Sequence, residues 1–272
     1  MKKITAISLT ILLTAISFAV IGCSVRILEP DLTPPSAPRG ITTSTGDNYI
    51  IVSWLANHEP DVEGYKVYVA TSYNGRYEYI GTTHRTYFTD TGARNGYTYY
   101  YAVSAFDRSD NESDLSADVI YDTPRPEGAN VILYNYRTQP GLAGYDFSSY
   151  SVGDYNDQYT DFYFEYYQGN FYLDVWTDSD IEDMGYTASL YEIGEAPTSG
   201  WSPTKDVPVI IGHTYVIRTW DNHYAKVRVT AVSSSSVVFD WAYQLQTGNA
   251  RLKQGIIHRK PLTSGSGVLG RL

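Results

Sequence analysis

Hydrophobic and polar positions alternate with a period of two in several stretches of the chain. In the first part the stretches lie at 49–54, 64–69 and 99–105. The residues on their apolar faces are Ile50, Val52 and Trp54, then Tyr65, Val67 and Val69, then Tyr99, Tyr101, Val103 and Ala105. Alternation of this kind is typical of half-buried β-strands, and two such sheets can pack their apolar faces together.

The second part of the chain predicts strands again. The candidate ranges are 131–134, 162–166, 171–176, 188–193, 215–219, 224–232 and 237–243. Trp220 to His223 lies between two of them and indicates a hairpin turn. Asp178, Asp180, Glu182 and Asp183 follow Trp176, and we expect them in a solvated loop; a second acidic group is Asp154, Asn156, Asp157 and Asp161. The fold class is therefore all-β, a sandwich followed by a second β-rich domain.

Proline and glycine divide the chain. Residues 124–128 (PRPEG) separate a first domain at 37–123 from a second, tyrosine-rich domain at 129–252. A proline-containing tether at 23–36 precedes the first domain, and we expect residues 253–272 to form a flexible tail.

The first 23 residues resemble the export signal of bacterial lipoproteins. Lys2 and Lys3 precede an apolar run, and Gly22 stands directly before Cys23, the only cysteine of the chain. This resemblance implies that residues 1–22 are a signal peptide and that Cys23 is acylated, which would anchor the protein in a lipid bilayer. Ser24 after the cysteine favours the outer membrane, facing outward or toward the periplasm. An uncleaved membrane-spanning helix is the alternative.

The first domain resembles a fibronectin type III domain. The resemblance rests on Trp54, on residues 61–68 (DVEGYKVY), on residues 99–107 (YYYAVSAFD) and on residues 111–116 (NESDLS). It implies that Trp54 is a core tryptophan and that the hydroxyl of Tyr99 bonds to backbone upstream, as in a tyrosine corner. Ala93 stands where that corner usually has leucine.

The second domain has a fainter resemblance to the HmuY-like haem-binding lipoproteins. It rests on residues 215–219 (YVIRT), 224–229 (YAKVRV) and 144–147 (GYDF). Haem binding in that family uses two histidines. His213 and His223 are the candidates here, but they lie ten residues apart along one strand and its turn, and we expect them at the surface.

Composition limits the partners. The net charge is −10, which disfavours nucleic acid because phosphate binding needs clustered basic residues. No nucleophile and base stand at a spacing that predicts catalysis, so we expect no enzyme, no cofactor and no metal. The 27 tyrosines suit strands and can also stack on sugar rings or peptide.

These features predict a non-catalytic cell-surface protein that binds an extracellular polysaccharide or a surface protein. Tyr150, Tyr155 and Tyr159 are the candidate binding residues, because they lie in a Gly- and Asp-rich stretch expected to be a loop. A polysaccharide-acting hydrolase or its accessory is one alternative, and capture of haem or metal is another.

Overall fold

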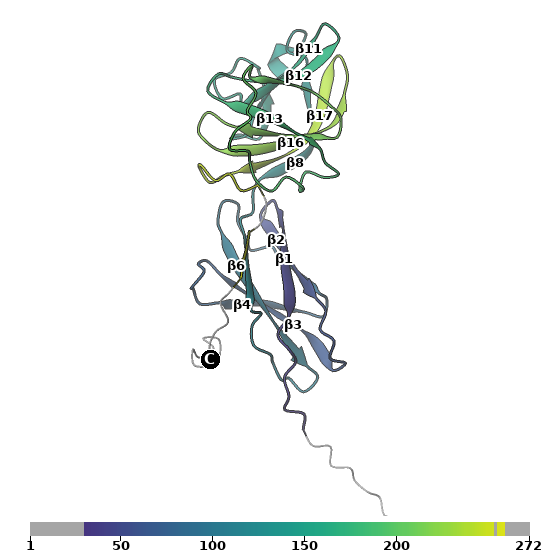
Figure 1. The fold of residues 1–272 in the computed structure, drawn as a ribbon, viewed down its shortest axis with the longest axis vertical. Helices are drawn as coiled ribbons and strands as arrows, with labels where there is room; N and C mark the ends of the chain where they lie inside the picture. The colour runs from purple at the N-terminus through teal and green to yellow at the C-terminus, as the bar shows by residue number, and fades with distance from the viewer. Residues whose placement is uncertain (1–29, 253–254, 259–272) are drawn as a thin grey trace, which may run out of the picture. The chain divides into compact units, whose positions relative to one another are not determined.

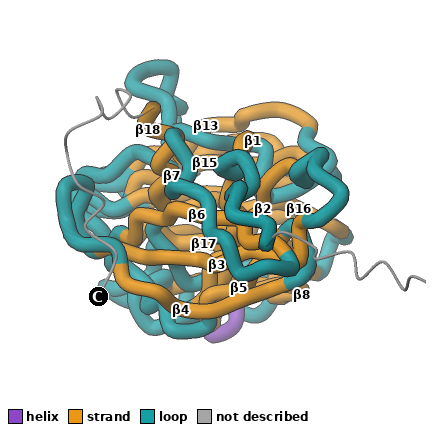
Figure 2. Tube along the Cα trace, turned by 90° about the horizontal axis from the view of Figure 1, so that it is seen from below, coloured by secondary structure: helices purple, strands orange, loops and turns teal. Residues whose placement is uncertain are grey.

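The computed structural model describes residues 30–252 and 255–258. Within them one short helical turn, η1 (Pro140–Leu142), interrupts an architecture that is otherwise strand and loop (Figure 2). The all-β prediction is confirmed. No helix in the described ranges is both long and apolar enough to cross a membrane. The expected signal peptide at 1–22 and the expected acylation site Cys23 lie outside the described residues.

The first group of strands forms two antiparallel sheets. One sheet has the order β1-β2-β5 and the other the order β18-β7-β6-β3-β4. The strands are β1 (Arg39–Gly46), β2 (Tyr49–Leu55), β3 (Val62–Ala70), β4 (Glu78–Thr83), β5 (Tyr87–Asp90), β6 (Tyr99–Asp107), β7 (Asp118–Asp122) and β18 (Gly255–His258) (Figure 1).

Alternation along β2, β3 and β6 places their apolar side chains in one shared core. Trp54 is 5% exposed and packs edge-on against Tyr65, with ring centroids 5.2 Å apart. The hydroxyl of Tyr99 accepts a hydrogen bond of 3.0 Å from the backbone N–H of Arg94, five residues upstream. Ala93 is buried in the same core. The predicted core tryptophan and the upstream backbone bond of Tyr99 are therefore both confirmed.

The second group of strands forms two five-stranded sheets. Their orders are β10-β9-β11-β12-β14 and β13-β15-β16-β17-β8. The strands are β8 (Glu127–Tyr134), β9 (Gly144–Asp146), β10 (Ser151–Gly153), β11 (Phe162–Tyr167), β12 (Asn170–Val175), β13 (Asp180–Tyr186), β14 (Asp206–Pro208), β15 (His213–Arg218), β16 (Tyr224–Val232) and β17 (Ser236–Gln244).

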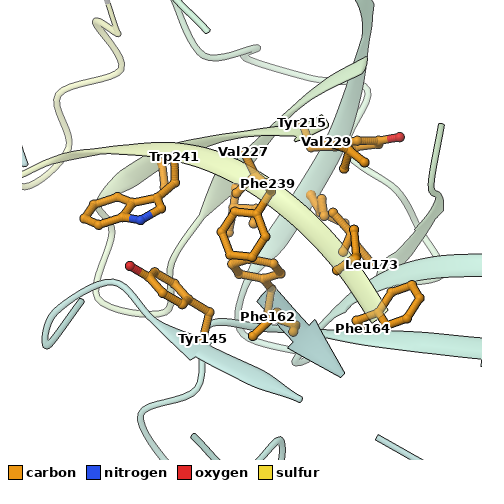
Figure 3. Close-up of a cluster of buried hydrophobic side chains, with 14 of the residues drawn as sticks. Tyr145, Phe162, Phe164, Leu173, Tyr215, Val227, Val229, Phe239 and Trp241 are labelled. Atoms are coloured by element: carbon orange, nitrogen blue, oxygen red, sulfur yellow. The ribbon is translucent and has the colours of Figure 1, made fainter. Parts of the chain in front are cut away.

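An aromatic core joins these two sheets (Figure 3). Tyr145 of β9 and Phe162 of β11 lie 5.5 and 5.3 Å from the ring of Phe239 in β17. Tyr145 also contacts Trp241 at 5.5 Å. Pairs of this kind add about 0.5–1.5 kcal/mol each beyond the burial of their area, so the tyrosine excess partly serves this core.

The acidic stretch after Trp176 is not the loop that the sequence predicts. Asp180 begins β13, which pairs with β15, and its carboxylate forms ion pairs with Lys205 and Arg218. Asp183 pairs with His213 at 2.9 Å. Cross-strand partners of opposite charge allow an acidic segment to form a strand, which local composition did not reveal.

The predicted strand at 188–193 is also wrong, because this segment is loop. It covers the face of the β13–β8 sheet that points away from the core, where Ala196, Val216 and Leu252 form a second buried cluster. Lys226 is fully buried there and donates to the carbonyl oxygens of Ile193 and Leu252 at 3.1 and 2.9 Å. The loop therefore supplies acceptors for a buried ammonium group.

The proline-containing segment between the two predicted domains is packed. Pro124, Arg125 and Pro126 are buried, and the N–H of Tyr243 donates to the Pro126 carbonyl oxygen at 2.9 Å. Strand β8 begins at Glu127, two residues before the predicted start of the second domain. In the segment expected to be a flexible tail, the backbone of Gly255–His258 forms β18 and pairs with β7, because an edge strand offers unpaired backbone groups.

Candidate functional site

Three loops of the second sandwich surround a pocket of about 430 Å³. The loop between β10 and β11 contributes most of the lining, the segment after β12 contributes Trp176 and Asp178, and the β15–β16 turn contributes Trp220. The lining residues are Asn156, Asp157, Gln158, Tyr159, Thr160, Trp176, Asp178 and Trp220. A concave site with aromatic walls and a few polar groups is the usual form of a small-ligand site.

Short-range hydrogen bonds shape the loop between β10 and β11. Asp154 Oδ1 accepts from the N–H of Asn156 at 2.9 Å, and Asp157 Oδ1 accepts from the N–H of Tyr159 at 2.9 Å. The hydroxyl of Thr160 donates to the carbonyl oxygen of Asp154 at 2.8 Å. Asp and Thr make such turns because their short side chains reach nearby backbone. The loop therefore presents Tyr159, which is 52% exposed, in a defined position.

A cluster of three tyrosines holds Trp176. Tyr163 of β11 lies 5.5 Å from the indole, and Tyr155 stacks on it at 6.4 Å with 24° between the planes. Tyr136 packs on Tyr155 at 4.7 Å and on Tyr163 at 5.4 Å. Arg137 lies over the outer side of this cluster, 5.0 Å from the Tyr136 ring. Because its neighbours pack on several sides, Trp176 enters the pocket wall in a fixed orientation.

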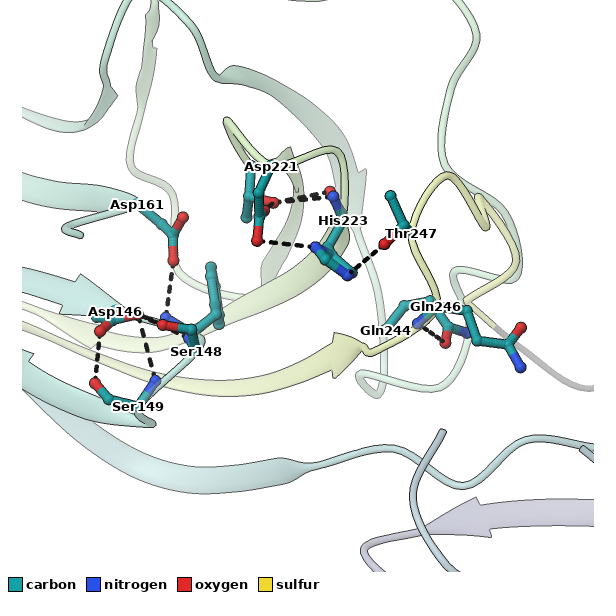
Figure 4. A network of polar contacts seen from close by, with 11 residues as sticks. Asp146, Ser148, Ser149, Asp161, Asp221, His223, Gln244, Gln246 and Thr247 are labelled. Carbon is teal, nitrogen blue, oxygen red and sulfur yellow. Dashed lines mark hydrogen bonds and ion pairs between the residues drawn. The ribbon is translucent and has the colours of Figure 1, made fainter. Parts of the chain in front are cut away.

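Trp220 lies in the β15–β16 turn, whose residues Asp221 and His223 form a network of polar contacts (Figure 4). The Thr219 hydroxyl donates to Asp221 at 2.5 Å and accepts from the N–H of His223 at 3.0 Å. His223 also pairs with Asp221 at 3.0 Å and contacts the Thr247 hydroxyl at 3.0 Å. Asn222 has a φ of +63°, which asparagine tolerates better than most residues. The turn predicted at 220–223 is confirmed, and it leaves Trp220 52% exposed.

A buried carboxyl lies directly after the pocket-lining Thr160. Asp161 is 4% exposed, and it accepts a 2.8 Å hydrogen bond from the N–H of Phe147 (Figure 4). Burial, together with the charges of Asp146, Asp221 and Asp178, raises the pKa of Asp161 to about 7. The region around the pocket therefore carries negative charge.

A second carboxyl, Asp174, stands on the outer face of β12. Burial raises its pKa to about 7, with Glu165 and Asp206 contributing, and its Oδ2 has no hydrogen-bond partner. A raised pKa is what a general acid needs. However, neither Asp161 nor Asp174 lines the pocket, so neither is placed to protonate a ligand bound there.

The structure separates the three tyrosines that the sequence singled out. Tyr159 lines the pocket, whereas Tyr155 supports Trp176 from behind. Tyr150 has a φ of +57° and stacks on Trp241 at 5.4 Å, away from the pocket lining. Sequence reasoning missed Trp176 and Trp220, although a tryptophan in a predicted turn was a usable signal, since turns seldom bury a large side chain.

The two candidate histidines do not meet. His213 at the start of β15 pairs with Asp183, and His223 at the start of β16 pairs with Asp221. Their side chains are partly exposed, 21% for His213 and 17% for His223, and each is paired with a carboxylate. Each imidazole contacts a different carboxylate. These contacts orient a strand end and a turn, and they do not bring the two histidines to one ligand.

Comparisons with known proteins concern about a third of the chain. No protein-family model matches this sequence. A stretch of 91 residues, 33% of this chain, is 36% identical to the amylopullulanase of Thermoanaerobacterium thermosulfurigenes and covers 5% of that protein. A stretch of 109 residues, 39% of this chain, is 33% identical to exoglucanase B of Cellulomonas fimi and covers 10% of it. The chain thus spans a tenth or less of the length of these two relatives.

A solved structure, an Fn3-like protein from Clostridium thermocellum, is 32% identical over 31% of this chain and 88% of its own, with a TM-score of 0.28. The strand order, the core Trp54 and the Tyr99 corner give the first sandwich a fibronectin type III-like fold. The stretches that match this chain in the amylopullulanase and the exoglucanase are fibronectin type III-like segments of much larger enzymes.

Proposed function

We propose that this chain is a non-catalytic glycan-binding protein, in which the fibronectin type III domain is a spacer and the second sandwich holds the ligand. The pocket of Trp176, Trp220 and Tyr159 is the observation that carries the proposal. Indole and phenol rings stack on the apolar faces of sugar rings, while neighbouring amide groups donate to and accept from the sugar hydroxyls and carboxylates accept from them. Asn156 and Gln158 supply such groups in the same lining.

The relatives support the ligand class. The matched segments belong to an amylopullulanase and an exoglucanase, whose names denote enzymes of polysaccharides. A spacer module of the same type in this chain fits a protein that works on a similar polymer. Asp161 and Asp174, the carboxyls whose pKa burial raises to about 7, are not among the residues that line the pocket, which favours binding over hydrolysis.

Binding to a glycan array, followed by calorimetry with the full chain, tests the proposal. Trp176→Ala and Trp220→Ala should each weaken binding by about tenfold or more, because central aromatic residues dominate such sites. Tyr97→Ala is the matched control, since Tyr97 is 65% exposed and lies in the first domain. An array without a ligand, or a ligand whose affinity ignores both tryptophans, contradicts the proposal.

Attachment to the cell envelope through Cys23 is a separate part of the proposal. It rests on the lone cysteine after Gly22 and on the basic and apolar residues before it. Mass spectrometry of protein taken from membranes should find an acylated Cys23 at the mature N-terminus. Protein that retains Met1 would contradict the anchor and leave the glycan pocket unaffected.

A further inference from the structure

The charge of the pocket indicates which class of glycan it binds. Two of the eight lining residues, Asp157 and Asp178, are acidic, and none is lysine, arginine or histidine. Both carboxylates are on exposed residues. Asp157 Oδ1 already accepts one backbone hydrogen bond from Tyr159, which leaves its second oxygen for a ligand.

The surroundings do not balance this charge. Asp161 lies beneath the loop, and the charges of Asp146, Asp221 and Asp178 make its ionisation harder. Arg218, two residues before Trp220, is engaged by Asp180, as is Lys205. His223 is held by Asp221. Arg218 and Lys205 are thus committed to another carboxylate, and Lys226, six residues after Trp220, is buried and donates to backbone carbonyl oxygens.

The aromatic lining suits a cation independently of the carboxylates. The face of an indole carries negative electrostatic potential and attracts an ammonium group within about 6 Å, with tryptophan the strongest of the aromatic side chains. Two tryptophans and one tyrosine from three separate loops form such walls here. An anionic glycan would meet both the carboxylates and the ring faces unfavourably.

We propose that the pocket selects glycans that carry a protonated amine, that is, polymers of glucosamine type, over neutral, N-acetylated or acidic glycans. This inference rests on the proposed function. The ammonium group lies between the carboxylates of Asp157 and Asp178, and the sugar ring stacks on Trp176 or Trp220. A pocket of about 430 Å³ lies in the size range of small-ligand sites, so it has room for a sugar ring.

Calorimetry of the full chain with three hexasaccharides tests the selection. The probes are the hexamers of glucosamine, N-acetylglucosamine and glucose, at a pH where the amine is protonated and at low and high NaCl. We expect the glucosamine hexamer to bind about tenfold more tightly than the other two. Added salt should reduce this preference, because exposed charges are screened.

Isosteric variants locate the effect. Asp157→Asn and Asp178→Asn should each reduce the preference at least about threefold, because each substitution weakens binding of the glucosamine hexamer more than binding of the glucose hexamer. Asp157→Asn keeps the Oδ1 acceptor for the N–H of Tyr159. Asp114→Asn, at an exposed acid of the first domain, is the matched control and should change nothing.

The outcomes separate the two proposals. Equal or tighter binding of the uncharged hexamers overturns the amine selection and leaves glycan binding standing. If polylysine binds as tightly as the glucosamine hexamer, and Trp176→Ala weakens that binding, the assignment of the ligand to a sugar is overturned. If none of the hexamers binds and the array finds no other glycan, the proposed function fails as well.

Discussion

Trp54 in β2 and Trp220 in the β15–β16 turn carry the same indole, but they are 5% and 52% exposed. In the first sandwich Trp54 and Tyr101 point into the core, where Trp54 packs on Tyr65 and the Tyr101 hydroxyl donates to Asp90 at 2.8 Å. In the second sandwich aromatics fill a core and also reach the loops. The difference shows that the place of an aromatic residue in the fold, more than its identity, decides whether it stabilises or binds.

The two regions also differ in what fixes their aromatic residues. Strand alternation alone directs Trp54 into the core. Trp176 instead depends on Tyr155 and Tyr163, which come from a loop and a neighbouring strand, and Trp220 depends on the hydrogen bonds of a turn. We therefore expect that removing an aromatic ring from the pocket lowers the affinity for the ligand more than it lowers the stability of the protein.

The largest expected effect is on the first core. Trp54→Ala should lower the free energy of unfolding by about 3–5 kcal/mol, because it removes a large buried side chain and leaves a cavity. Urea denaturation followed by circular dichroism measures the change. A loss below about 1 kcal/mol would mean that Trp54 is not a core residue and would break the contrast with Trp220.

Asp161 should make stability depend on pH. Burial raises its folded-state pKa to about 7 from the ordinary value of 3.8, so the folded protein keeps a proton that the unfolded chain has lost. Its contribution to the free energy of unfolding therefore falls by about 2–4 kcal/mol as pH rises from about 4 to 7. Above that window the contribution is constant.

The comparison of wild type with Asp161→Asn, by urea denaturation at pH 4, 6 and 8, checks this dependence. The amide stays neutral and can still accept the bond from the Phe147 N–H, so its curve should be flatter in that window. Asp114→Asn controls for a change of surface charge. Parallel curves for wild type and Asp161→Asn would show that Asp161 ionises normally.

Tyr155 should affect binding through Trp176. Tyr155→Ala removes the ring that stacks on the indole and on Tyr136, which should cost about 1–2 kcal/mol of stability and weaken glycan binding about fivefold. Tyr155→Phe keeps the ring and should restore both. Near-ultraviolet circular dichroism reports the packing of Trp176, and an unchanged spectrum in Tyr155→Ala would show that the stack does not orient it.

The smallest effect on stability is expected at the pocket rim. Trp220→Ala should change the free energy of unfolding by less than about 0.5 kcal/mol, since the indole is largely exposed. It should nevertheless weaken glycan binding about tenfold or more. Denaturation and calorimetry on the same preparation give both values. A stability loss above about 1 kcal/mol would make Trp220 a structural residue of the turn.

The amino-acid sequence determined most of the strands. Alternation at 49–54, 64–69 and 99–105 predicts β2, β3 and β6, and the apolar runs at 162–166 and 224–232 predict β11 and β16. These predictions succeeded because each strand has one face buried in a core, so its burial pattern repeats every second residue.

Local patterns failed where partners distant in sequence decide the conformation. β13 is acidic, which predicts a loop, but it is a strand in which Lys205 and Arg218 form ion pairs with Asp180 and His213 contacts Asp183. The segment at 188–193 has the composition of a strand, yet it covers a sheet face and supplies an acceptor to buried Lys226.

The candidate site lay beyond the sequence for the same reason. Tyr159 could be selected as an exposed loop tyrosine, but nothing local joins it to Trp176 or Trp220, which are 17 and 61 residues further along the chain. Only the packing of two sheets brings the loops that carry them around one pocket. The sequence thus determined which segments form strands, through periodic burial, while the tertiary structure decided which loops meet, because that depends on strand order and register.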